Sequence, residues 1–100
     1  MSHPSKSMFK PAAKLTMDNA SQTLAAGLQA IAAGTLDFDL SDVLRVDSSA
    51  VAMLLEWQRQ ALQKGVRLRF GVLPANLQSL IALYGVADLL SALADTPKNG

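Results

Sequence analysis

The sequence predicts a single α/β domain in which a small β-sheet is flanked by helices. Segments with alternating apolar and polar residues are separated by stretches of helical periodicity. The connections between successive strands and helices are short, which favours parallel neighbours in one sheet. The chain has 100 residues, half of them hydrophobic, and this length and composition suit one domain with its own core.

The first ordered segment is expected to be a strand at residues 9–15. Pro11 lies inside it, which indicates an edge strand or a broken one. A run of helix-capping residues follows and predicts a helix that ends at Gly34. Gly27, in the interior of this helix, weakens it slightly. Three apolar residues define its buried face by their helical spacing: Leu24, Leu28 and Ile31.

A second strand is predicted around residues 36–40, where apolar and acidic residues alternate strictly. Asp37 and Asp39 share one face, and paired carboxylates can perform acid–base chemistry. A solvated strand face is the favoured interpretation, because charged side chains are normally exposed. Residues 41–47 are expected to form a short connection to the next helix.

The clearest helix in the sequence follows this connection. Ser48 and Ser49 supply capping hydroxyls and Gly65 ends the helix. One side of the helix should face the sheet, and it carries Val51, Leu54, Leu55, Gln58 and Leu62.

Two large apolar residues of this helix are expected to project away from that side. Met53 and Trp57, together with Gln60, lie opposite the apolar side or on its flank. Near Ser48, they would make a docking surface. The alternative is that Trp57 folds back along the edge of the core.

The last predicted strand and helix lie in the C-terminal third. Residues 66–72 alternate as a strand does, and Pro74 is placed to open a helix that Gly85 ends. Residues 86–93 form either a short strand or a final apolar helix. The domain therefore spans residues 8–94, with residues 1–7 expected to be disordered and residues 95–100 expected to be a flexible tail.

Composition excludes several chemical functions. The chain has no cysteine, and its one histidine, His3, lies in the polar N-terminal segment. It contains neither of the glycine-rich loops that bind nucleotide phosphates. The sequence therefore predicts that the protein is not an enzyme and that it binds neither a cofactor nor a metal ion.

Charge and hydropathy bear on the partners. Nine basic and eight acidic residues give a net charge of +1, and the basic residues are dispersed, which disfavours nucleic acid. No uninterrupted apolar run reaches the roughly eighteen residues of a membrane helix. We expect a cytoplasmic protein without direct membrane insertion, which could still join a membrane complex through a partner.

The most informative motif is the run Asp47-Ser48-Ser49 at the start of the helix at residues 49–64. A helix N-terminus carries unpaired N–H groups and partial positive charge. Serine and aspartate there are ordinary caps. A phosphate on Ser48 would also suit this position, because the helix dipole favours negative charge. The two interpretations do not exclude each other.

Over residues 9–93 the chain resembles the STAS-domain family, which includes anti-sigma-factor antagonists and the tails of sulfate transporters. The resemblance is carried by the aspartate-serine pair that opens a helix after a strand. Two further motifs resemble one branch, the cytoplasmic STAS subunit of phospholipid-transport ABC complexes in Gram-negative bacteria. They are D-L-S-x-V-x-R-V-D at residues 39–47 and L-x-x-L-Y-G at residues 80–85.

The resemblance implies a small mixed sheet flanked by helices and a set of partner-binding residues. Ser48 corresponds to the phosphorylated serine of the antagonists and to the functionally important hydroxyl residue of the transporter subunit. Ala50 departs from the antagonist pattern, which typically has glycine there. The residues expected to bind or lie beside the partner are Asp47, Ser48, Ser49, Ala50, Met53 and Trp57.

The function implied by the resemblance is non-catalytic. The protein would bind and regulate or stabilise the ATPase subunit of a phospholipid-transport ABC complex that maintains outer-membrane lipid asymmetry. It would reach the permease, and the periphery of the inner membrane, through that ATPase. The alternative is an anti-sigma-factor antagonist, switched when an anti-sigma serine kinase phosphorylates Ser48.

Overall fold

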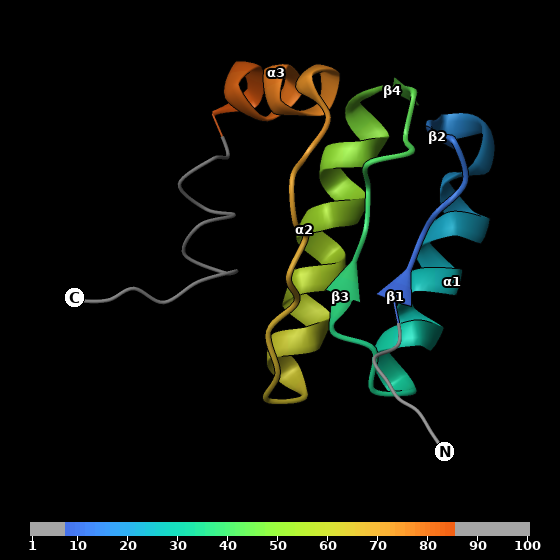
Figure 1. Ribbon diagram of the computed structural model, residues 1–100, viewed down its shortest axis with the longest axis vertical. Helices are drawn as coiled ribbons and strands as arrows, with labels where there is room; N and C mark the ends of the chain where they lie inside the picture. The colour runs from blue at the N-terminus through green and yellow to red at the C-terminus, as the bar shows by residue number, and fades with distance from the viewer. Residues whose placement is uncertain (1–7, 86–100) are drawn as a thin grey trace.

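The computed structural model describes residues 8–85 of the chain (Figure 1). Strands and helices alternate as the sequence predicts. The expectations for residues 1–7, 86–93 and 95–100 lie outside the described residues. The elements are β1 (Met8–Phe9), β2 (Lys14–Leu15), a short 3-10 helix η1 (Met17–Asn19), α1 (Ala20–Ala32), β3 (Asp37–Phe38), β4 (Arg45–Val46), α2 (Ser48–Gln63) and α3 (Ala75–Tyr84).

Three extended segments lie side by side and form the sheet layer. β1 pairs in parallel with β3, and β2 pairs in parallel with β4. A parallel bridge joins Asp37 to Arg69 in the third segment. The first segment is interrupted between β1 and β2, where Pro11 lies, as the sequence predicts. The α/β class is confirmed, and every strand pair among residues 8–85 is parallel.

Two expectations about the strands need correction. The segment at residues 41–47 is more than a connection, because it contains β4, whose partner is β2. The segment at residues 66–72 is not a regular strand, because its only sheet pairing among the described residues is the bridge at Arg69. Its alternation is nevertheless real: Leu68 is buried, whereas the side chains of Arg67 and Arg69 are exposed.

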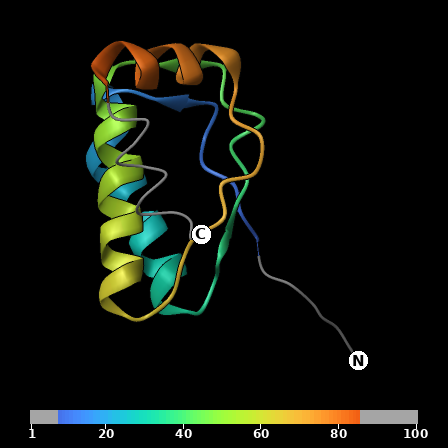
Figure 2. The ribbon, with the colours of Figure 1, turned by 90° about the vertical axis from the view of Figure 1, so that its left-hand side faces the viewer.

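The two long helices cover the same face of the strands, and α3 crosses one end of this two-layer arrangement (Figure 2). Glycine ends all three α-helices of residues 8–85 as predicted, and Gly34 follows the cap of α1 with φ of 98°. Gly65 follows the cap of α2, and Gly85 caps α3 in the left-handed conformation, with φ of 69°. The C-terminus of α2 is thereby fixed, and its N-terminus lies at the same end of the molecule as α3 and β4 (Figure 1).

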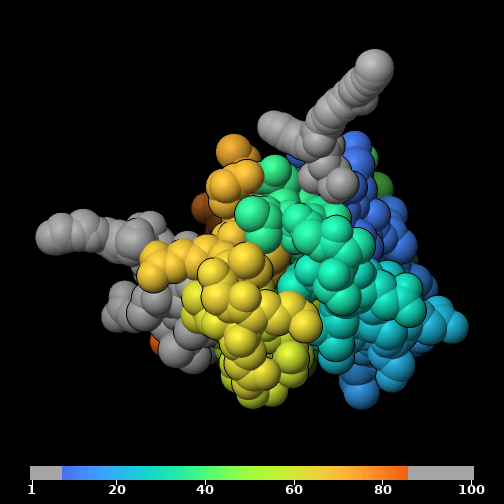
Figure 3. All heavy atoms as spheres, turned by 90° about the horizontal axis from the view of Figure 1, so that it is seen from below, coloured from blue at the N-terminus to red at the C-terminus, as the bar shows by residue number. Residues whose placement is uncertain are grey.

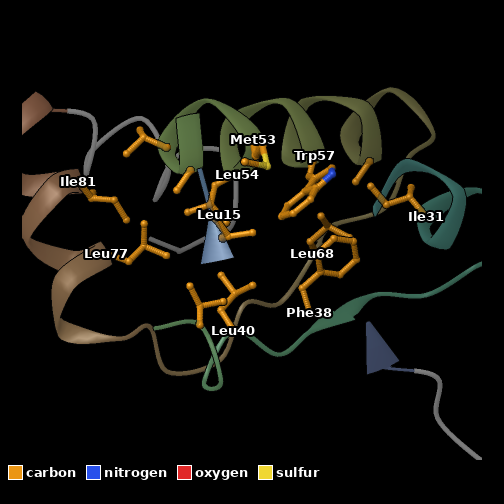
Figure 4. Close-up of a cluster of buried hydrophobic side chains, with 14 residues drawn as sticks. Leu15, Ile31, Phe38, Leu40, Met53, Leu54, Trp57, Leu68, Leu77 and Ile81 are labelled. Atoms are coloured by element: carbon orange, nitrogen blue, oxygen red, sulfur yellow. The ribbon is translucent and has the colours of Figure 1, made fainter. Parts of the chain in front are cut away.

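The core fills the space between the helices and the strands (Figure 4). Aromatic rings occupy its centre: the ring centroids of Phe9 and Phe38 are 4.8 Å apart, and that of Trp57 lies 5.2 Å from Phe38. The fully buried large side chains are those of Leu15, Phe38, Leu40, Leu54, Trp57, Gln58, Leu68 and Leu77.

The expectation that Met53 and Trp57 project away from the core is wrong. Their exposed fractions are 3% and 0%, and Figure 4 shows both among the core side chains, with Trp57 directed toward Phe38 and Leu68. The reason is that α2 packs against α1 as well as against the strands, so its buried arc is wider than the apolar stripe suggests. The alternative, in which Trp57 folds into the core, is the correct one.

One polar side chain belongs to this core. Gln58 has no exposed surface, and its amide pairs with both backbone groups of Leu68. Its Nε2 donates to the Leu68 carbonyl at 3.3 Å, and its Oε1 accepts from the Leu68 N–H at 3.0 Å. Gln58 therefore does for Leu68 what a neighbouring strand would do, and it ties α2 to the third extended segment.

Candidate partner-docking site

The candidate site is built around the N-terminus of α2, which Asp47 caps. Asp47 directly follows β4 and has an extended backbone conformation. The Oδ1 atom of Asp47 accepts a hydrogen bond from the Ser49 N–H at 2.8 Å. Its Oδ2 accepts another from the Met17 N–H at 3.0 Å. These bonds, the one from Met17 first, hold the pKa of the Asp47 carboxyl below its usual value. The carboxylate is thus committed to positioning the helix.

Ser48 follows the Asp47 cap and is the first residue of α2. Its side chain is exposed, and its hydroxyl makes no hydrogen bond to any described residue. Ser49 is half-buried, and Ala50 has no exposed surface. An uncommitted hydroxyl at a helix N-terminus can donate to or accept from a partner, and it lies where negative charge is favoured.

A groove of about 410 Å³ begins at Ser49, the residue after Ser48, and runs between α1 and α2. Its walls are mainly apolar and consist of small side chains, with Met53 and Leu24 as the larger members and Glu56 among the lining residues. Among the residues of α2 it includes the series Ser49, Ala52, Met53 and Glu56, whose spacing places them on one face. The lining residues are Ala20, Ser21, Leu24, Ser49, Ala52, Met53 and Glu56.

The six residues predicted to bind or lie beside the partner differ in their exposure and contacts in the structure. Ser48 is exposed and Ser49 lines the groove. Asp47 is occupied by capping, whereas Ala50 and Trp57 are fully buried and present no surface to a partner. Met53 is also buried, although it contributes to the groove. The exposed part of the candidate site is therefore the α1–α2 groove and not Trp57.

Sequence reasoning missed Ser21, Leu24, Ala52 and Glu56, which line the groove. The residues of α2 could have been found, because Ala52 and Glu56 follow Ser49 at helical spacing. The residues of α1 gave no such signal, since nothing in the sequence indicates that α1 lies beside this face of α2.

The described residues show no metal site. Residues 8–85 contain no group of three or more histidine, cysteine or acidic side chains that could hold a metal ion.

The two aspartates of the second extended segment are paired with cations across the open face of the sheet. Asp37 accepts from Arg69 at 2.7 Å, and Asp39 lies 3.8 Å from the Lys10 ammonium. Among residues 8–85, no helix has the length and hydropathy needed to span a membrane.

Comparison with known proteins agrees with this geometry. A family model described as Mlab, STAS domain matches residues 5–91, which include all the described residues. No curated protein matches the chain closely enough to count as a relative. The resemblance drawn from the aspartate-serine motif is confirmed. The chain belongs to the Mlab-type STAS-domain family.

Proposed function

We propose that this protein is a non-catalytic subunit that binds the cytoplasmic ATPase of an Mla-type phospholipid-transport ABC complex. Such a complex maintains the lipid asymmetry of the outer membrane. The observation that carries the proposal is the exposed Ser48, whose neighbour in the chain, Ser49, lines the α1–α2 groove. The Mlab family match supports the choice of partner.

The groove suits a protein partner better than a small reacting molecule. It is open and its walls are short, so a helix or an extended segment could approach the backbone of α1 and α2 closely. Ser48, Ser49 and Ser21 would provide hydrogen bonds at its rim, while Leu24 and Met53 would provide apolar contact. A surface of this kind suits binding, and the carboxylate in its lining, Glu56, is hydrogen-bonded by Arg59 and Gln60.

Regulation would follow from binding alone. The subunit would stabilise whichever ATPase conformation it binds more tightly, since a ligand shifts an equilibrium only by its differential affinity. It would contribute no nucleotide-binding residue, and it would remain in the cytoplasm, attached to the inner membrane through the ATPase and its permease.

The test is binding to the purified ATPase subunit of the host's Mla-type transporter, measured by isothermal titration calorimetry. Ser48→Glu places a charge at the rim of the groove and should weaken binding at least about tenfold, because a charge without a partner is costly in an interface. Gln63→Glu adds the same charge at the exposed opposite end of α2 and should bind as the unmodified protein does.

Ser48→Glu should keep its fold by circular dichroism, because a glutamate in the first turn of a helix is compatible with the helix dipole. Gln63→Glu opposes the dipole at the last residue of α2, but at this exposed position the cost should be no more than about 1 kcal/mol and the fold should also stay intact. Unchanged affinity of Ser48→Glu, or absence of binding by the unmodified protein, would contradict the proposal.

The exposure of Ser48 also favours a second candidate, an antagonist of an anti-sigma kinase. An exposed hydroxyl at a helix N-terminus can receive a phosphate without loss of the fold, and the added charge would then break docking. Mass spectrometry of the protein isolated from its host tests this candidate. Phosphate on Ser48, together with release from a serine kinase, would support it, whereas unmodified Ser48 in all growth conditions would reject it.

A further inference from the structure

Two large apolar side chains are exposed at the end of the molecule that carries the N-terminus of α2. The exposed fractions are 75% for Met17, in η1, and 72% for Leu44, just before β4. Both are attached to the site by their backbones: the Met17 N–H donates to Asp47, and the Leu44 N–H donates to the Ala13 carbonyl. These hydrogen bonds fix the backbones of both residues, and the two apolar side chains remain open to contact with a partner.

A polar pocket of about 320 Å³ lies at the same end, where β2 and β4 pair. Lys14 and Arg45 are directly opposite each other in this pair, so the pocket has two cationic side chains in its wall. The complete lining is Lys14, Thr16, Asp18, Arg45, Val46 and Asp47.

The charges in this pocket do not cancel at every position. The Lys14 ammonium lies 3.4 Å from the Asp18 carboxylate, and both oxygens of Asp47 accept backbone N–H groups. The side chain of Arg45 makes no ion pair or hydrogen bond with any described residue, although its backbone N–H donates to the Ala13 carbonyl. Its guanidinium is therefore the charge that this end of the molecule offers to a ligand.

We propose that Met17, Leu44 and Arg45 form a second contact with the ATPase partner, for an apolar segment that carries an aspartate or glutamate. This rests on the proposed function. Arg45 would pair with the carboxylate, which its planar guanidinium can bind through two parallel hydrogen bonds. Met17 and Leu44 would contact the apolar residues of that segment.

The position of Arg45 makes one partner sufficient for both contacts. β4 leads directly into α2, with Asp47 as the residue between them, so Arg45 and Ser48 lie only three positions apart in one continuous segment. A partner seated at Ser48 would therefore extend over Arg45. A lipid surface fits less well, because recognition of anionic headgroups typically uses about four to eight basic residues, whereas this end offers one uncommitted cation.

The experiment compares charge reversal at the two ends of the protein. Arg45→Glu should weaken binding of the purified ATPase subunit at least about tenfold, since it opposes like charges. Lys64→Glu is the matched control, because Lys64 is also exposed and belongs to the C-terminal turn of α2, at the end seen in Figure 3. That variant should bind normally. Leu44→Ser should weaken binding as well. The loss of affinity in Leu44→Ser should depend less on salt concentration than the loss in Arg45→Glu, because salt screens charges and not apolar contacts.

The outcomes separate this proposal from the proposed function. Weak binding by Ser48→Glu with full binding by Arg45→Glu would overturn the second contact and retain the first. Loss of binding by Arg45→Glu that a carboxylate-to-lysine change in the ATPase restores would establish the ion pair. If Arg45→Glu instead lost binding to vesicles of phosphatidylglycerol and kept full affinity for the ATPase, the surface would be a lipid contact and the proposal would be wrong.

Discussion

The indole ring of Trp57 lies directly against Gly27, where α1 has no side chain. A Cβ on Gly27 would lie 2.8 Å from Cζ2 of the ring and closer still to Nε1. The indole N–H donates to the Leu24 carbonyl of α1 at 3.0 Å. The close approach of the two helices therefore depends on a glycine on one side and a tryptophan on the other.

Gly27→Ala should destabilise the protein, although the same change in an ordinary helix interior stabilises it by about 1 kcal/mol. The ring cannot move away, because it is held between Phe9 and Phe38 and by the bond to Leu24. Overpacking of this kind costs about 1–3 kcal/mol, which exceeds the helix gain. Urea denaturation measures the free energy of unfolding.

The control for this substitution is a background without the indole. In Trp57→Leu protein the added methyl group meets no ring, so Gly27→Ala should stabilise that background. If the substitution destabilised both backgrounds equally, the contact with Trp57 would not be the cause.

Trp57→Ala should lower the free energy of unfolding by about 3–5 kcal/mol, the range for truncating a large buried aromatic side chain. A docking residue on the surface would instead leave stability unchanged and reduce only binding. Trp57 is the single tryptophan, so its fluorescence reports its own surroundings. In the unmodified protein the emission should shift to longer wavelength on unfolding, and an emission already typical of exposed indole would contradict its burial.

The prediction that Trp57 projects away from the core was wrong for a physical reason. Apolar residues at Val51, Leu54 and Leu55 define the centre of the face that meets the strands, and Trp57 falls off that centre. A helical wheel describes one interface, whereas α2 has two, one with the strands and one with α1. The signal was present in the spacing of Ala50, Met53, Leu54, Trp57, Gln58 and Ala61, all of them buried.

Gln58→Leu should destabilise the protein by about 2–4 kcal/mol, even though leucine is more hydrophobic and similar in size. The change leaves the N–H and carbonyl of Leu68 without partners in the core, and each unsatisfied buried group costs about 1–3 kcal/mol. Thermal unfolding by circular dichroism measures the effect. Gln60→Leu, at a half-buried position on the same helix, serves as the control, and an equal loss in both variants would reject this role for Gln58.

The Asp47 cap should make stability depend on pH in the acidic range. Its folded-state pKa is lowered from 3.8 by hydrogen bonds from Met17 and Ser49, so the ionised form stabilises the fold. That stability is fully present above the unfolded-state pKa and is lost as pH falls through the folded-state value. Asp47→Asn keeps a capping oxygen and removes the charge. The difference in unfolding free energy between the two proteins should be greatest near neutral pH and shrink below pH 3.8. A constant difference at all pH values would contradict this.

The helices and the capped site were predictable because their signals are local. Gly85 ends α3 at the position that the sequence indicates, and α2 begins where expected, although Asp47 caps it in place of the predicted Ser48 and Ser49 hydroxyls. The α1–α2 groove was not predictable in the same way. It lies between α1 and α2, whose contact through Gly27 and Trp57 joins residues thirty positions apart. β4 was missed because a two-residue strand carries too little alternation to recognise.

Parallel pairing imposes an order on how this chain acquires its structure. The paired residues Met8 and Asp37, Lys14 and Arg45, and Asp37 and Arg69 are all about thirty positions apart, because parallel strands need a crossover connection between them. On a ribosome, β1 therefore has no strand partner until α1 and β3 have emerged, and β3 lacks its second partner until α2 and the third extended segment have emerged. Closure of the sheet depends on contacts between distant residues, so the chain should fold more slowly than a helical domain of the same length.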